Sequence, residues 1–142
     1  MPGNGKLFMK KTAAFLSLLI LFMMLGGCRM IKIEEAERTP LKYTVADRSQ
    51  IPEEAAKLIE EIKEKEFQMV YQKGEDLYLI KGYGRQMSGG YSIQVAELSA
   101  SSTTIFFKTR LIGPEKENQS GAPSYPYIAV KTDYREEPVV FE

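Results

Sequence analysis

In several segments from Phe67 onward, apolar residues recur at every second position, and this alternation limits the fold more than any other feature. It is clearest in the segments 67–71, 91–95, 103–111 and 127–134. A period of two places apolar side chains on one face of a β-strand, whereas a helix needs a period of about 3.6. The second half of the chain is therefore predicted to form strands.

Two neighbouring segments predict a β-hairpin. Phe67–Tyr71 alternates, residues 73–76 contain Gly74 among polar residues, and Leu77–Tyr83 is again rich in apolar and aromatic residues. Two strand-forming segments joined by a short turn that contains glycine are typical of an antiparallel hairpin.

One helix is predicted over residues 52–66. Pro52 suits the first turn, and Ala55, Leu58, Ile59 and Ile62 make one apolar stripe. Because no second helix is available for parallel crossovers, we expect an α+β domain, mainly an antiparallel sheet of about five to six strands with this helix on one face. Short strands are also expected at 41–45 and 139–141. An open sheet and a curled partial barrel both remain compatible with the pattern.

The N-terminal segment has the layout of a signal peptide. Lys6, Lys10 and Lys11 precede an uncharged, almost wholly apolar run from Ala13 to Leu25. At about 1.5 Å per residue the run covers roughly 20 Å, less than the ~30 Å of a hydrocarbon core. This length favours a signal-peptide core over a permanent membrane span.

The residues that follow resemble the lipobox of bacterial lipoproteins, because Gly26 and Gly27 precede Cys28. The resemblance implies cleavage before Cys28 and a diacylglyceryl group on its thiol, with the lipid as the membrane partner. The alternative is a free cysteine in an ordinary transmembrane anchor. The predicted organisation is a signal peptide over 1–27, a lipidated tether over 28–40 and a folded domain over 41–142, on the extracytoplasmic face of the cell membrane.

Composition argues against several function classes. Lysine plus arginine and aspartate plus glutamate number 19 each, so no overall basic charge indicates nucleic acid. The chain has no histidine and one cysteine, which removes Ser-His-Asp and Cys-His catalysis, histidine metal sites and Cys₄ zinc sites. We therefore expect no catalytic residue, no metal and no cofactor.

Four glycines fall between Gly82 and Gly90 and form the most conspicuous motif. A dinucleotide fingerprint would need a third glycine where Met87 stands, and a phosphate loop would need lysine at Gly90 and a hydroxyl at Tyr91. Both also need a helix next, whereas a strand is predicted. The stretch is therefore a long loop between strands, and its glycines serve either the connection itself or recognition.

This loop resembles a motif of the PrcB C-terminal domain family. Gly84, four further residues and then Gly-Gly-Tyr-Ser-Ile at 89–93 carry the likeness, and Tyr-Pro-Tyr at 125–127 is similar to the element that opens the family's last strand. Family members commonly have Pro-Thr where residues 87–88 are Met-Ser. The resemblance covers about residues 41–134. It implies partner binding without catalysis, because the family is named after a lipoprotein that associates with and stabilises a surface protease complex.

Tyrosines flank two glycine- or proline-bearing loops, 84–91 and 113–126. A tyrosine side chain combines apolar area with a polar end, which suits an interface, so we expect the two loops to lie together as one exposed patch. The alternative is that Tyr91 and Tyr127 are core residues at strand ends. The candidate partner-binding residues are Gly84, Ser88, Gly89, Gly90, Tyr91, Tyr125, Pro126 and Tyr127.

The sequence thus predicts a membrane-anchored extracytoplasmic lipoprotein that acts as a non-catalytic protein-binding module, an accessory or stabilising subunit of a surface protease complex. One alternative is a peptidase inhibitor that presents the 84–91 loop, since Ser88–Tyr91 is faintly similar to a loop of chagasin-like inhibitors. A second alternative is a protein that binds a small molecule or an envelope polymer, which would need a concave apolar pocket.

Overall fold

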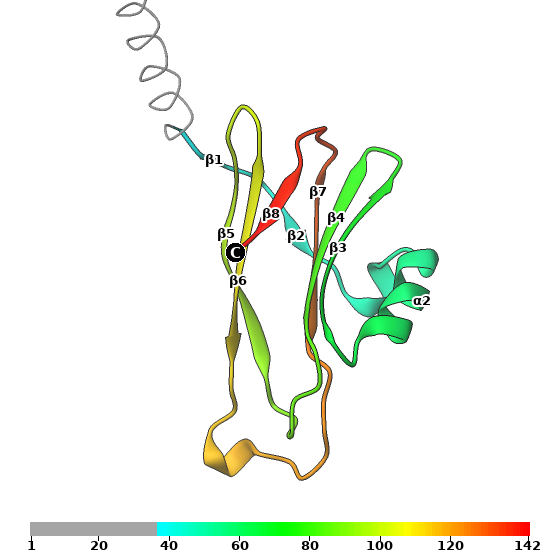
Figure 1. The fold of residues 1–142 in the computed structure, drawn as a ribbon, viewed down its shortest axis with the longest axis vertical. Helices are drawn as coiled ribbons and strands as arrows, with labels where there is room; N and C mark the ends of the chain where they lie inside the picture. Colours follow the sequence, from blue (N-terminus) through cyan, green and yellow to red (C-terminus); the bar gives the residue numbers. More distant parts are fainter. Residues whose placement is uncertain (1–36) are drawn as a thin grey trace, which may run out of the picture. The chain divides into compact units, whose positions relative to one another are not determined.

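The computed structural model describes residues 37–142, whose compact unit is Arg38–Glu142. The predicted signal peptide, Cys28 and the tether as far as residue 36 lie outside the described residues. The described part consists mainly of β-strands, with one α-helix and two short 3₁₀ helices (Figure 1). The elements are β1 (Thr39–Pro40), β2 (Thr44–Val45), η1 (Arg48–Gln50), α2 (Glu53–Ile62), β3 (Glu66–Lys73), β4 (Asp76–Tyr83), β5 (Ser92–Ala100), β6 (Ile105–Ile112), η2 (Lys116–Asn118), β7 (Tyr127–Asp133) and β8 (Val139–Phe141).

The strands form two four-stranded sheets. Sheet A has the order β1-β5-β6-β8 and sheet B has the order β2-β7-β4-β3. All neighbours are antiparallel except β6 and β8, which are parallel. The α+β class and the antiparallel pairing are confirmed, while the predicted five to six strands are corrected to eight in the described residues.

One additional strand comes from the segment before α2. The single strand predicted over 41–45 is instead two short pieces, because Thr39–Pro40 pairs with β5 and Thr44–Val45 pairs with β7. The chain crosses from one sheet to the other between them. Pieces of two residues are too short for alternation to reveal, and β1 uses residues that the sequence analysis assigned to the tether.

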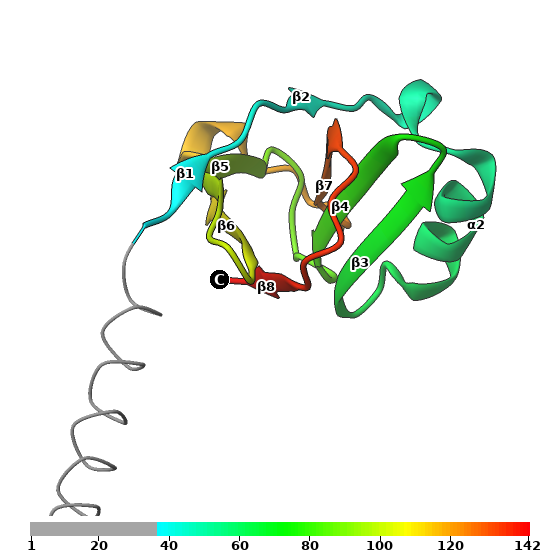
Figure 2. The same cartoon turned by 90° about the horizontal axis from the view of Figure 1, so that it is seen from above.

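Two apolar cores hold three layers together (Figure 2). The first core lies between the sheets, and the second lies between sheet B and α2. The buried residues of the first core are Leu77, Leu79, Leu98, Ala100, Ile105, Phe107 and Val130. Those of the second core are Ile51, Ala55, Ile59, Tyr78, Ile80 and Ala129.

Strand β4 contributes to both cores, which explains its nearly continuous apolar sequence. Leu77 and Leu79 belong to the inter-sheet core, whereas Tyr78 and Ile80 belong to the core under α2. The predicted hairpin is confirmed, since β3 and β4 pair along their whole length on either side of a turn that contains Gly74. A strand buried on both faces is a central strand, and here it forms the middle layer of the domain.

Helix α2 begins as predicted, after Pro52, but ends at Ile62 instead of residue 66. The apolar stripe stops at Ile62, and the polar residues that follow form a turn into β3. The charged residues there suit a helix by propensity, but Phe67 must enter the sheet, and tertiary packing overrides propensity. Within residues 37–142, no helix has the length and apolar character needed to cross a bilayer.

Arg38 connects the start of β1 to the rest of sheet A. Its Nη1 donates to Glu97 Oε2 in β5 at 2.9 Å and to Glu142 Oε1 after β8 at 3.1 Å. The guanidinium carbon lies 3.6 Å from the ring centre of Phe106 in β6. A cation stacked on an aromatic face between two carboxylates orders the point where the chain enters the domain.

The Arg38 contact makes stability depend on pH. The pKa of the Glu97 carboxyl lies below its ordinary 4.5, first because the Ser99 hydroxyl donates to it and next because Arg38 does. A carboxylate with a lower pKa in the folded state stabilises the fold above its unfolded pKa, and this stabilisation is lost as the pH falls through the folded pKa.

We therefore expect Glu97→Gln to lower the urea midpoint of unfolding at neutral pH. The difference from the unaltered chain should shrink once the pH falls below 4.5. Urea titrations of both proteins across this range check it, and a difference that stays constant with pH would count against the ion pair.

Candidate functional site

The two loops predicted to lie together are in direct contact. Loop 84–91 joins β4 to β5 and loop 113–126 joins β6 to β7, and both lie at the same end of the domain (Figure 1). The Gln86 amide donates to the Ser124 carbonyl at 2.8 Å, and the Ser124 amide donates back to the Gln86 carbonyl at 3.0 Å. This antiparallel bridge confirms that the loops form one surface.

Side chains add two further links between the loops. Ser124 Oγ donates to the carbonyl of Ser88 at 2.7 Å, and the amide of Gly89 donates to Ser120 Oγ at 2.8 Å. Two of the predicted site residues, Ser88 and Gly89, are therefore held through their backbone atoms. Such contacts give loop 84–91 a defined shape, as a recognition loop on a rigid scaffold requires.

Two glycines of the motif have a structural explanation. Gly84 has φ +71° and Gly90 has φ +85°, a left-handed region that disfavours other residues. A Cβ at Gly84 would lie 2.9 Å from the Glu66 amide nitrogen, and one at Gly90 would lie 2.9 Å from Pro114 Cβ. The glycines therefore shape the loop, and recognition falls to the side chains around them.

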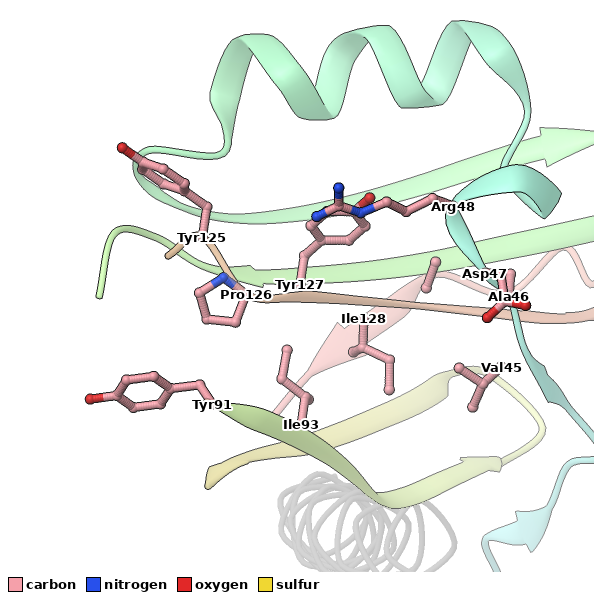
Figure 3. A pocket seen from close by; sticks show the side chains of 11 residues that line it. Val45, Ala46, Asp47, Arg48, Tyr91, Ile93, Tyr125, Pro126, Tyr127 and Ile128 are labelled. Carbon is pink, nitrogen blue, oxygen red and sulfur yellow. The ribbon is translucent and has the colours of Figure 1, made fainter. Parts of the chain in front are cut away.

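Four predicted residues line a pocket beside the joined loops. Tyr91, Tyr125, Pro126 and Tyr127 contribute to a hollow of about 380 Å³. Figure 3 shows Ile93 of β5 facing Ile128 of β7, with Tyr91, just before β5, at one end of the pocket and Val45 at the other. The tyrosines are half-buried, so each presents part of its ring to the pocket or to solvent.

The pocket exists because the short strands cover only part of each sheet edge. Strand β1 pairs with β5 at Ser99 and Ala100, and β2 pairs with β7 at Val130 and Lys131. Within residues 37–142, no strand continues either pairing to the end where the loops meet. The two sheets therefore open toward solvent at that end.

Two cations lie over tyrosines of the site. The Arg48 guanidinium carbon is 5.7 Å from the ring centre of Tyr127, and Lys63 Nζ is 5.2 Å from that of Tyr125. These are cation–π distances. Arg48 is exposed, whereas Lys63 Nζ also donates to Glu60 Oε2 at 2.7 Å. In residues 37–142, no group of three acidic, histidine or cysteine side chains is arranged to hold a metal ion.

Sequence reasoning missed several residues of this site. Met87 is 79% exposed at the tip of loop 84–91, although the sequence marks it only as a departure from the family pattern. Ser120 and Ser124 link the loops, and Arg48 comes from a segment far away in the sequence. The serines of loop 113–126 were the only available signal, and small polar residues are common in any loop.

Comparison with known families gives a match for the middle of the chain. The family model described as PrcB C-terminal matches residues 77–133, the stretch from β4 to β7 that includes both loops. No curated protein and no solved structure matches the chain. The resemblance seen in the sequence is therefore confirmed over this stretch, and residues 77–133 are a PrcB C-terminal-like region.

Proposed function

We propose that this protein is a lipid-anchored extracytoplasmic module that binds a protein partner through the joined loops, as an accessory subunit of a surface protease complex. The observation that carries the proposal is the set of hydrogen bonds that holds loop 84–91 against loop 113–126, with Met87 79% exposed at the tip. A preorganised, partly apolar surface loses little entropy on binding. The family similarity supports a protease complex as the partner class.

The module acts by surface complementarity and carries out no reaction itself. Met87 supplies a flexible apolar side chain, which adapts to a partner surface. Tyr91 and Tyr125 supply rigid rings with polar ends, and aromatic residues are enriched at interface centres. Arg48, which is exposed and lies over Tyr127, adds positive charge to the rim and favours a partner with acidic residues.

Anchoring follows from Cys28 in this proposal. We expect Cys28→Ser to abolish metabolic labelling with palmitate and to leave the chain unprocessed, because the thiol is the site of diacylglyceryl transfer. Labelling followed by fractionation of the host cells checks this. Undiminished labelling of the serine variant would contradict the lipoprotein assignment, without affecting the proposed docking surface.

Partner binding is tested by affinity capture from detergent-solubilised host membranes after cross-linking. The baits are the intact chain, Met87→Glu in the patch and Val140→Glu on β8, which is 44% exposed and serves as the control. Docking would remove water from a carboxylate at position 87, which is unfavourable. We therefore expect the Met87→Glu bait to capture at least about tenfold less peptidase than the intact chain. Equal capture by all three baits would contradict the assignment of the patch.

The pocket supports a second candidate function, binding of a small molecule or an envelope polymer. Its volume of about 380 Å³ lies within the usual range for ligand sites, and its walls combine Ile93 and Ile128 with tyrosines and Arg48. Binding of a ligand there would raise the melting temperature of the chain without any protein present. A screen of envelope-polymer fragments by thermal shift separates this function from protein docking.

A further inference from the structure

Strand β3 is an open edge of sheet B. In the described residues it pairs with β4 on one side and has no strand on the other. Residues 67–72 contain no charge, no proline and no glycine. Edge strands are normally protected by such residues or by a covering segment, and an unprotected edge is a template for another strand.

One face of β3 is also exposed. Gln68, Val70 and Gln72 face away from α2 and are accessible, with Val70 47% exposed. Phe67, Met69 and Tyr71 point to the other face and pack in the core under α2. The face of β3 turned away from α2 is therefore polar and aliphatic, and the face under α2 is mostly aromatic.

Helix α2 extends over this edge. Tyr71 Oη donates to Glu54 Oε2 at 2.9 Å, which places the Glu54 flank of α2 above β3. Leu58 and Ile62 follow Glu54 at intervals of four and share its flank, yet they are 45% and 38% exposed. Exposed apolar side chains of strand and helix, namely Val70, Leu58 and Ile62, therefore form a step along one side of the domain.

We propose that a second copy of this chain fills the step by antiparallel pairing of the two β3 strands about a two-fold axis at Val70. The sequence 68–72, Gln-Met-Val-Tyr-Gln, is nearly the same read in either direction. This register places Val70 opposite its own equivalent, Gln68 opposite Gln72 and Met69 opposite Tyr71. Cross-strand pairs of this kind stabilise a sheet, and a self-complementary surface is what a two-fold dimer requires.

The same axis brings the helices together. An axis perpendicular to the joined sheet keeps both α2 helices on one face, with their Leu58 and Ile62 flanks turned toward each other. Strand pairing and the burial of Leu58 and Ile62 point to the same occupant. The dimer contact uses none of the residues assigned to the joined loops, so it is tested independently of the proposed partner binding.

The test is the association state of the full chain purified in detergent, followed by sedimentation equilibrium over a range of concentrations. We expect the intact chain to form a reversible dimer. The Val70→Lys and Leu58→Glu variants should have a dimer dissociation constant at least about tenfold higher, because like charges then meet on the axis or inside the contact. Ile112→Lys, at a residue 44% exposed on sheet A, is the matched control and should dimerise normally. A monomeric intact chain, or a dimer that both variants leave unchanged, overturns the proposal.

A covalent readout does not depend on how well a charged variant folds. Val70→Cys places a thiol on the two-fold axis beside its own equivalent, so mild oxidation should join the Val70→Cys copies through a disulfide, with the oxidant removing two electrons and two protons. Ile112→Cys and the unaltered chain are the controls and should form no disulfide-linked dimer under the same oxidation. Failure of Val70→Cys to cross-link above both controls overturns the register.

Discussion

Replacing Gly84 with alanine is expected to lower the free energy of unfolding by about 2–4 kcal/mol. At φ +71° a side chain is strained, and its Cβ would lie 2.9 Å from the Glu66 amide nitrogen and 3.1 Å from the Lys65 carbonyl carbon. Both atoms are backbone where the turn after α2 enters β3, and the Arg85 amide donates to the Glu64 carbonyl in that turn at 3.0 Å. No flexible side chain can move aside to relieve the contact.

Two other glycines separate the causes of this loss. Gly74 has φ +61°, and a Cβ added there would have no atom within 4 Å, so Gly74→Ala reports the conformational cost alone. Gly121 has no positive φ, and a Cβ added there would have no atom within 4 Å. Gly121→Ala should therefore leave the free energy of unfolding almost unchanged. Urea unfolding of the three variants gives the comparison. If Gly84→Ala lowers the free energy of unfolding no more than Gly74→Ala does, the close backbone approach at Gly84 adds no destabilisation. The explanation of Gly84 by this close approach is then wrong.

Replacing Leu79 with alanine is expected to cost about 2–5 kcal/mol. Leu79 is fully buried in the inter-sheet core, on the central strand that belongs to both apolar cores. Its neighbours are held by β-ladders on both sides of β4, so they cannot collapse to fill the cavity. The loss should therefore fall in the upper part of the range for such substitutions.

Val140→Ala is the matched control for Leu79, because it also removes aliphatic carbon from a strand and lies outside both proposed binding surfaces. Val140 is 44% exposed on β8, so its truncation should cost less than about 1 kcal/mol. Chemical unfolding followed by circular dichroism measures both. Equal losses for the two variants would mean that the sheets do not form the tight inter-sheet core described above.

The sequence predicts the long strands well and the short ones poorly. Alternation locates β3, β5, β6 and β7 because each of these strands has one more buried face over many residues. It cannot assign β1 and β2, whose two residues each give no period. It also cannot show that the strands divide into two sheets, since the division depends on where the chain crosses between Pro40 and Thr44.

The candidate site was predictable in outline only. The tyrosines beside both loops indicated that the loops lie together, and the bridge between Gln86 and Ser124 confirms it. The pocket was not predictable, because it arises where β1 and β2 stop short of Tyr91 and Tyr127. Whether a glycine serves shape or recognition also depends on its φ and its neighbours, which no spacing in the sequence reveals.

The proposed docking role implies that a partner touches the tip of loop 84–91 in the living cell. The most direct measurement is photo-cross-linking from an unnatural amino acid at position 87, compared with the same amino acid at position 140 on β8. The two positions are exposed at 79% and 44%. We expect position 87, and not position 140, to give one covalent adduct that contains a peptidase. Adducts of equal yield at both positions, or none at position 87, would contradict the assignment of the joined loops as the docking surface.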